Sequence, residues 1–499
     1  MINFSEITTH FDNITNAWIQ NFFDVNQEHR ERINRYAQFW NWYKGKHWAV
    51  GNDVDTITTL NYIKRIVDEK IVFFSKNGFE ISVPEDPNQT SAKVDNNFVK
   101  VLLDDVWEKN NRDVFLMDAA QMAAVTGDCW IKPSVDQDCD GNDYIRLDVL
   151  SSSMCFPEFD TRDKKRVKRF HIIYPTVEEN ITFSIFADNR GNGSKRRIKW
   201  FRETYTKEKI EYFEDDVLLE SLPNVLNEIP VIHIKNFPDT DSCFGISDVD
   251  VLRSVNKAYN EAVTDMRIII DYYAKPQLFA KGIDTSDLEK GVDNIWSTSN
   301  VDADIKAIDV LDDLKPSIDF TNVLYRSLFD LSGVPEQAIN PTKNVSNTPG
   351  VALHMAYLPI IHTRLVKIKA FTTGLKEVNR LILKMNSLLD PAFGRKLQAL
   401  GTRKYNTELT FGEDLPRDEV QQLENKNQEL TMGITTRKEV LLARGVGPTD
   451  ADRILREADE DLATRLEIQA RYNGKATEPA FGNRRKPDPV VQGDKVSRQ

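Results

Sequence analysis

Gly-Ile-Ser-Asp-Val-Asp-Val-Leu, residues 245–252, opens the segment from Cys243 to Phe371 that decides the fold. Ser247 suits a helix N-cap, because its side-chain oxygen can accept hydrogen bonds from unpaired amides of the first turn. Apolar residues then recur at steps of three or four over roughly 25 residues, which predicts a helix with one apolar face. These residues are Leu252, Val255, Tyr259, Val263, Met266, Ile270 and Tyr273.

An acidic segment and a second helix follow. Residues 282–315 carry nine acidic residues against three lysines, a net charge of −6. The second helix is expected to begin at Pro316, a residue favoured in a first helical turn, and to end at Ser332 before Gly333 and Pro335. Two such helices cannot bury their apolar faces alone, but copies repeated around a ring can.

A polar loop, residues 333–349, leads into a third, long helix. Thr348 and Pro349 favour the N-cap and the first helical position. The helix expected over 350–389 contains Pro359, which should kink it. Its cations form either an ordinary solvated face or a sparse set of contacts to DNA phosphates, few enough to position a duplex without gripping it. The basic residues of the loop and the helix include Lys343, Arg364, Lys367, Lys369 and Lys376.

The N-terminal half combines helices with an antiparallel β-rich region. Helical patterns cover 1–48 and 93–126, and residues 78–83 alternate as a strand does. Between Cys129 and about Ile234, short alternating stretches are separated by turn residues, which predicts antiparallel strands.

The C-terminal part is expected to be helical up to a disordered tail. The tail, 474–499, contains prolines and a basic cluster and should be disordered in isolation. The fold class predicted for the whole chain is therefore α+β, with helix dominating. The C-terminal helices are expected at about 416–432, 436–444 and 450–472.

Composition narrows the range of functions. The 499 residues are 40% hydrophobic and 28% charged, as in a folded protein. The net charge of −12 disfavours a sequence-specific DNA reader, which usually carries a basic domain, but permits a conduit along which DNA slides.

Four cysteines without a Cys-x-x-Cys pair indicate reduced thiols. Neither a signal peptide nor a run of roughly 18 apolar residues is apparent, so we expect cytoplasmic synthesis and no membrane span.

One stretch resembles a metal site. Residues 136–141 read Asp-x-Asp-x-Asp-Gly, as at the start of a calcium-binding EF-hand loop. The match then fails, because Asp143 stands at the usually apolar eighth position and Leu147 at the position of the bidentate Glu. An acidic hairpin turn explains the stretch better, and bound calcium is the alternative.

No pattern of catalytic residues is found. Residues 191–195 are glycine-rich but lack the spacing of a phosphate-binding loop, so a hairpin turn is expected there. Without such a loop the chain has no recognisable nucleotide-hydrolysing site, and any ATP-driven motor that acts with it must be a partner protein. No His-x-x-x-His pair and no Gly-x-Ser-x-Gly element occurs. We therefore expect no enzyme activity, no metal and no cofactor.

Several motifs together resemble the portal proteins of tailed bacteriophages, in the family typified by siphophages of Gram-positive hosts. The resemblance covers about residues 35–470. The motifs that carry it are Tyr-Lys-Gly-Lys-His (43–47), Leu-Asn-Tyr-Ile-Lys-Arg-Ile-Val-Asp (60–68), Phe-Glu-Ile (79–81), Gly-Ile-Ser-Asp (245–248) with Ala-Tyr-Asn (258–260), and Leu-Pro-Arg-Asp (415–418).

The resemblance implies a portal-type, ring-forming fold with wing, stem, clip and crown regions. The regions it implies are a wing (1–243), a first stem helix (244–273), a clip (274–315), a second stem helix (316–332), a tunnel loop (333–349), a kinked wing helix (350–389), a crown (390–473) and a tail (474–499).

The resemblance also implies a function and partners. Portal proteins form a ring, usually of twelve subunits, at one capsid vertex of the virion, which is assembled in the host cytoplasm. Double-stranded DNA passes through the ring during packaging and ejection, without sequence specificity. The implied partners are the terminase large subunit, scaffolding and major capsid proteins, and head-completion or adaptor proteins.

Candidate site residues follow from these regions. The candidates for lining the DNA tunnel are Lys343, Asn344, Asn347, Arg364 and Lys367. The candidates for docking a motor or adaptor at the clip are Asp302, Asp304, Asp309, Asp312 and Asp313.

Two other functions stay open from the sequence alone. One is a structural head adaptor or scaffold through which no DNA passes. The other is a metal-dependent nuclease, whose activity would depend on Asp136, Asp138 and Asp140.

Overall fold

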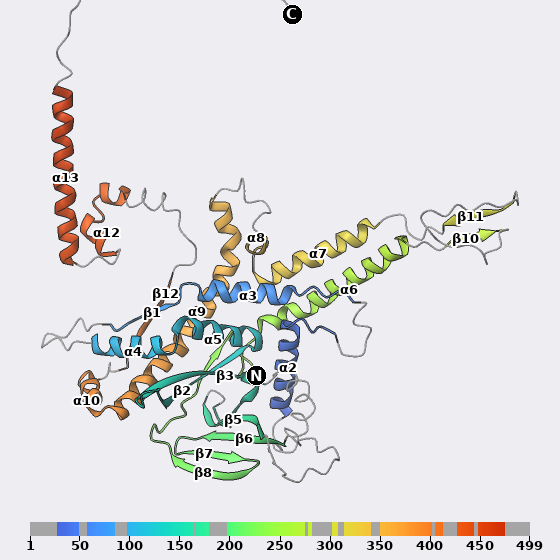
Figure 1. Ribbon diagram of the computed structural model, residues 1–499, viewed down its shortest axis with the longest axis horizontal. Coiled ribbons are helices and arrows are strands. Elements are labelled where there is room, and N and C mark those ends of the chain that lie inside the picture. Colours follow the sequence, from blue (N-terminus) through green and yellow to red (C-terminus); the bar gives the residue numbers. More distant parts are fainter. Residues whose placement is uncertain are drawn as a thin grey trace, which may run out of the picture. The chain divides into compact units, whose positions relative to one another are not determined.

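Figure 1 shows the computed structural model, which separates into two compact units, Met1–Asp414 and Leu415–Gln499. Helices and antiparallel strands both contribute to the first unit, so the helix-rich α+β class is confirmed. The structure describes residues 27–48, 57–84, 97–163, 166–178, 197–274, 278–281, 302–307, 314–340, 350–401, 405–412, 427–443 and 448–474.

The helical core of the first unit is built around α3 (Tyr62–Ser75) and α9 (Gly350–Leu389), which α2 (Gln27–Tyr43), α4 (Asn97–Lys109) and α5 (Arg112–Thr126) accompany. Asn61 begins α3, since its side chain accepts a hydrogen bond from the amide of Lys64 at 3.1 Å. Phe74 of α3 packs against Phe371 of α9 with ring centroids 4.7 Å apart. Burying each large apolar side chain stabilises the fold by about 1.5–3 kcal/mol.

The helical pattern predicted over 93–126 is two helices. Asn111 adopts a left-handed conformation, with φ of 52°, and separates α4 from α5. Asparagine tolerates this conformation better than most residues, and helical periodicity does not reveal it. Gly127, with φ of 90°, ends α5 near the predicted position.

The β-rich region predicted from Cys129 to Ile234 is confirmed as two antiparallel sheets. The smaller sheet has the order β3-β2-β9, and the larger has the order β4-β5-β6-β7-β8. Trp130 of the smaller sheet and Phe170 of the larger lie in one apolar cluster with Tyr205 and Phe244. The strands are β2 (Asp128–Gln137), β3 (Asp143–Leu150), β4 (Cys155–Phe159), β5 (Val167–Glu178), β6 (Arg197–Tyr205), β7 (Lys209–Glu214), β8 (Val217–Pro223) and β9 (Ile232–Lys235), and the 3-10 helix η2 (Ser152–Met154) precedes β4.

A further two-stranded sheet joins distant parts of the chain. β1 (Phe79–Ser82), which the sequence predicts, pairs antiparallel with β12 (Glu408–Phe411). The short helix α10 (Pro391–Ala399) precedes β12, and Asp390 caps it by accepting from the amide of Ala392 at 2.8 Å.

The segment between Cys243 and Ser332 forms two long helices and a two-stranded antiparallel sheet. α6 (Asp248–Ala274) is followed by β10 (Leu278–Lys281) and β11 (Asp304–Ala307), which pair antiparallel. α7 (Lys315–Ser332) comes next and packs along α6 (Figure 1). We call α6 and α7 the two-helix arm. The short helix α8 (Glu336–Ile339) follows it.

The second unit holds α12 (Arg437–Ala443) and α13 (Pro448–Gly474). Thr436 begins α12 in a reciprocal arrangement with Glu439, in which each side chain accepts from the other's backbone amide, at 2.9 and 3.2 Å. The predicted segment 416–426 and the predicted tail beyond Gly474 lie outside the described residues. None of the described helices is both long and apolar enough to cross a membrane.

Candidate functional site

The base of the two-helix arm is fixed by a very close approach of two backbone segments. Gly127, at the end of α5, and Gly245, just before α6, lie back to back. A Cβ on Gly127 would lie 2.5 Å from the carbonyl oxygen of Gly245, which no side chain tolerates. Ser247 then caps α6 by accepting from the amide of Val249 at 3.0 Å, and it donates to the carbonyl of Val125 at 2.6 Å.

Asp128 is the first of two buried carboxylates at this base. Its Oδ1 accepts from the backbone amide of Gly245 at 2.8 Å and from Nε2 of His233 at 2.6 Å. Its Oδ2 accepts from the hydroxyl of Tyr36 on α2. One side chain therefore connects α2, β9 and the segment that leads into α6.

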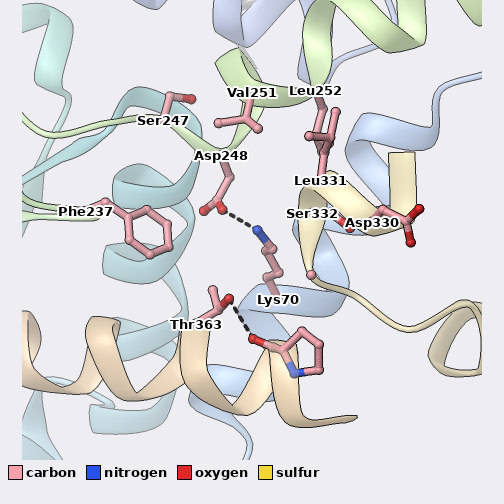
Figure 2. Close-up of a pocket in the computed structure, with 12 residues that line it drawn as sticks. Lys70, Phe237, Ser247, Asp248, Val251, Leu252, Asp330, Leu331, Ser332 and Thr363 are labelled. Atoms are coloured by element: carbon pink, nitrogen blue, oxygen red, sulfur yellow. Dashed lines mark hydrogen bonds and ion pairs between the residues drawn. The ribbon is translucent and has the colours of Figure 1, made fainter. Parts of the chain in front are cut away.

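Asp248 is the second buried carboxylate. It accepts from Nζ of Lys70 on α3 at 2.7 Å and from Nζ of Lys367 on α9 at 2.6 Å (Figure 2 shows the Lys70 contact). Asn236 adds a hydrogen bond through Nδ2 at 3.0 Å. We call Asp248, Lys70 and Lys367 the buried ion triad. It joins the first residue of the arm to α3 and α9.

The triad shifts the pKa values of Asp248 and Lys367. Burial alone would raise the pKa of Asp248, but the attraction of Lys367 and Lys70 outweighs it and holds that pKa well below its ordinary value. Burial lowers the pKa of Lys367, and the negative charge of Asp248 opposes this effect. Since the carboxylate of Asp248 is the charge that both ammonium groups share, the triad depends on it most.

A cavity of about 270 Å³ lies beside the triad (Figure 2). Lys70 and Asp248 line it together with Phe237, Leu331 and Thr363, which come from different elements. A second cavity of about 330 Å³ adjoins it at Gly333, lined by Arg326, Glu336 and other residues of α7, α8 and α9. The two cavities flank the turn that connects α7 to α8.

Gly333 makes this turn possible. It ends α7 with φ of 69°, and its amide donates to the carbonyl of Phe329 at 3.0 Å. Pro359, opposite on α9, has no amide to donate within the helix, and Thr363 donates its hydroxyl to the carbonyl of Pro359 at 3.0 Å. In Figure 1 the N-terminal part of α9 runs in a different direction from the rest of the helix.

The predicted tunnel candidates fall in two groups. Lys343, Asn344 and Asn347 lie outside the described residues. Arg364 and Lys367 lie in the interior, with only 3% and 4% of their surface exposed. Arg364 donates to the carbonyls of Phe73 at 3.1 Å and Gly412 at 2.9 Å. Contact of these two residues with DNA stays a prediction, and their burial argues against it.

The predicted clip candidates are described in part. Asp304 is the first residue of β11 and Asp302 precedes it, and both are exposed. Asp309, Asp312 and Asp313 lie outside the described residues.

The acidic stretch 136–141 forms the predicted hairpin turn between β2 and β3. Oδ1 of Asp138 accepts from the amides of Asp140 at 2.9 Å and Asn142 at 2.8 Å, which is a turn stabilised by its own side chain. In the part of the chain that the structure describes, no group of three or more His, Cys, Asp or Glu residues is placed to hold a metal ion. The glycine-rich stretch 191–195 lies outside the described residues.

The buried ion triad is not predicted from the sequence. From the sequence alone, Asp248 has no role beyond its place in the Gly-Ile-Ser-Asp motif, and Lys367 is expected on a solvated face or in contact with DNA phosphates. A signal was present, because Arg364 and Lys367 continue the spacing of the apolar residues Ile360, Phe371 and Leu375. Charged residues on the buried face of a helix indicate internal ion pairs or hydrogen bonds.

The family model described as "Phage portal protein, SPP1 Gp6-like" matches residues 23–463. No curated protein matches the chain significantly. The matched residues include every strand that the structure describes, the two-helix arm, α9 and part of the second unit.

Proposed function

Since this chain belongs to the SPP1 Gp6-like family of phage portal proteins, we propose that it forms the ring at a single capsid vertex of the virion through which DNA is packaged and ejected. The observation that carries the proposal is the family match over residues 23–463. We expect a closed ring of twelve copies, with double-stranded DNA passing along its axis without sequence specificity.

The exposed apolar residues of the two-helix arm support a ring. Phe320 and Val323 of α7 are 57% and 59% exposed, and Ile268 and Ile270 of α6 are exposed as well. Large apolar side chains left exposed on two helices that pack together are candidates for an interaction site. A neighbouring copy related by rotation would cover it, and rotation closes the ring.

We propose that the clip, residues 274–315, docks first the terminase large subunit and then the head-completion proteins. Exposed Asp302 and Asp304 support this role, because acidic residues attract basic partner surfaces and accelerate encounter. Replacing both by Lys should weaken terminase binding in a pull-down, and unchanged binding would contradict the assignment. Scaffolding and major capsid proteins are the partners we expect during nucleation of the procapsid.

We propose that loop 333–349 contacts the moving DNA through Lys343, Asn344 and Asn347. Substituting these three residues by Ala should spare ring assembly and slow packaging. Packaging at the wild-type rate would remove the loop from the mechanism.

Electron microscopy combined with native mass spectrometry tests the proposed function. The expected result is a ring of about twelve subunits with a channel at least as wide as a duplex, roughly 20 Å, because B-DNA must pass along it. If the protein alone is monomeric, the same measurement is repeated with scaffolding protein present, and ring formation in that mixture decides whether the chain is a portal subunit. A closed dimer without a channel would overturn the proposal, and a ring with a blocked centre would favour a head adaptor.

A further inference from the structure

The connection between β4 and β5 is strongly basic, although the chain as a whole is acidic. Residues 162–169 read Arg-Asp-Lys-Lys-Arg-Val-Lys-Arg, six cations against one carboxylate, in a protein of net charge −12. This basic stretch belongs to the larger sheet, and the proposed ring, channel and clip assign it no role.

The described part of this connection borders a cleft. The cleft has a volume of about 550 Å³ and lies between the β4–β5 connection and the β6–β7 turn. Five cations and three carboxylates contribute to its lining, together with Val167, Thr204 and Thr206. The charged residues are Arg166, Lys168, Arg169, Lys207 and Lys209, with Asp160, Glu208 and Glu211.

The two walls of the cleft are held in place by their own hydrogen bonds. In the first wall, the amide of Asp160 donates to the carbonyl of Arg166 at 2.8 Å. In the second, the hydroxyl of Thr206 accepts from the amide of Lys209 at 2.9 Å, and Asn224 donates to the carbonyl of Thr206 at 2.7 Å. β5 and β6 pair directly beneath, so the cations project from a fixed frame.

Much of the positive charge is available to a ligand. Arg169 and Lys209 lie 3.9 and 3.3 Å from Glu158 and Glu211. Within the described ranges of the chain, no carboxylate lies within ion-pair distance of Arg166, Lys168 or Lys207. All three side chains are exposed, so binding an anion there requires no loss of an internal ion pair.

We propose that this cleft binds an acidic, extended polypeptide segment of a partner protein. Its volume is that of a site for a small ligand or a few residues of peptide, rather than for a duplex. Its own carboxylates would repel the uniform negative charge of DNA, whose phosphates follow one another at about 1.7 Å along the axis. A peptide can instead place its acidic side chains against the cations and neutral or basic ones against Glu208 and Glu211, and such alternation gives specificity.

Fluorescence anisotropy on the full-length protein tests this proposal. The probe is a labelled short peptide of alternating Glu and Ser, with the Gln-Ser peptide as the uncharged control, at about 0.15 M salt, where the Debye length is about 8 Å. The variant is Arg166→Glu with Lys207→Glu, both at exposed turn positions. A matched variant, Lys100→Glu with Lys109→Glu, places the same charge change at two exposed positions of α4.

The expected result is binding of the Glu-Ser peptide alone, weakened about tenfold by the cleft variant and unchanged by the α4 variant. Equal weakening by both variants would show that net charge, and not the cleft, attracts the peptide, and would overturn the proposal. Displacement of the peptide by a short DNA duplex at equal phosphate concentration would overturn it too, in favour of nucleic acid. The proposal concerns one face of the larger sheet, so its failure would leave the proposed ring untouched.

Discussion

Asp248 is the residue on which the base of the two-helix arm most depends. Its carboxylate faces Nζ of Lys70 and Nζ of Lys367, and all three side chains are buried. Asp248→Asn would leave two ammonium groups close together without a counter-charge, and breaking a buried ion pair in this way costs about 3–5 kcal/mol. Denaturant unfolding of the variant should show a loss of this size.

Two other variants make the result specific to the triad. Asp250→Asn removes an exposed carboxylate from the same helical turn, 3.4 Å from Arg253, and should cost at most about 1 kcal/mol. Lys367→Met leaves Asp248 paired with Lys70 and should cost less than Asp248→Asn. Equal losses in Asp248→Asn and Asp250→Asn would show that Asp248 acts only through the helix dipole.

The triad should also make stability depend on pH in the acid range. The pKa of Asp248 is lower in the folded protein than in the unfolded chain, where it is about 3.9. Such a group contributes its full stabilisation above the unfolded pKa and loses it as the pH falls towards the folded pKa. The difference in unfolding free energy between wild type and Asp248→Asn should therefore be constant near neutrality and shrink below about pH 4. A difference that stays constant to pH 2 would contradict this assignment.

The positions of individual charged residues are the least predictable feature of this sequence. Periodicity located the faces of the long helices, but Arg364 and Lys367 were classed by charge as surface residues. In the folded chain they lie on the apolar face of α9, where Arg364 satisfies two backbone carbonyls and Lys367 pairs with Asp248. Their partners are distant in sequence, so no local pattern predicts the pairing.

At the scale of the elements, α9 contacts the smaller sheet through a glycine. A Cβ on Gly374 would lie 2.6 Å from Cδ1 of Ile234 on β9 and closer still to its Cγ1, so the helix and strand approach too closely for a side chain. Gly374→Ala should destabilise the first unit by about 1–3 kcal/mol through overpacking, although Ala favours a helix. Thermal unfolding measures the change.

A double change tests the cause of that destabilisation. Ile234→Ala removes both Cγ1 and Cδ1 of the isoleucine, the two atoms that the new Cβ would meet. The double variant Gly374→Ala with Ile234→Ala should therefore be destabilised by less than the sum of the two single changes. If Gly374→Ala instead raises the melting temperature, the close packing of α9 on β9 is not a constraint on this position.

The prediction of elements succeeded where local chemistry specifies them. Ser247, Pro316 and Gly333 are local signals, and α6 and α7 begin and end within a residue or two of the predicted positions. The pairing of β1 with β12 joins residues 79–82 and 408–411, and a strand pattern carries no information about so distant a partner. The cavities beside the triad likewise depend on how α3, α6, α7 and α9 pack together.

At the scale of the whole molecule, a single chain leaves apolar surface on the arm uncovered. Phe320 and Val323 face outward from α7, whereas Leu328 and Phe329 of the same helix are buried. One face of α7 therefore belongs to the fold of the chain. We expect the other to belong to contacts between copies.

Phe320→Asp tests this division between folding and assembly. Packing a carboxylate into an apolar contact between copies should cost about 3 kcal/mol per interface, or roughly a hundredfold in each association constant, since the charge loses its water without gaining a partner. The unfolding free energy of the single chain should hardly change, because Phe320 is exposed there.

Asn322→Asp adds the same charge two residues away and is the matched control. Native mass spectrometry should find rings for wild type and for the control and separate chains for Phe320→Asp. Rings formed equally well by all three proteins would show that this face of α7 is not an interface, and would require the ring to close through other parts of the chain.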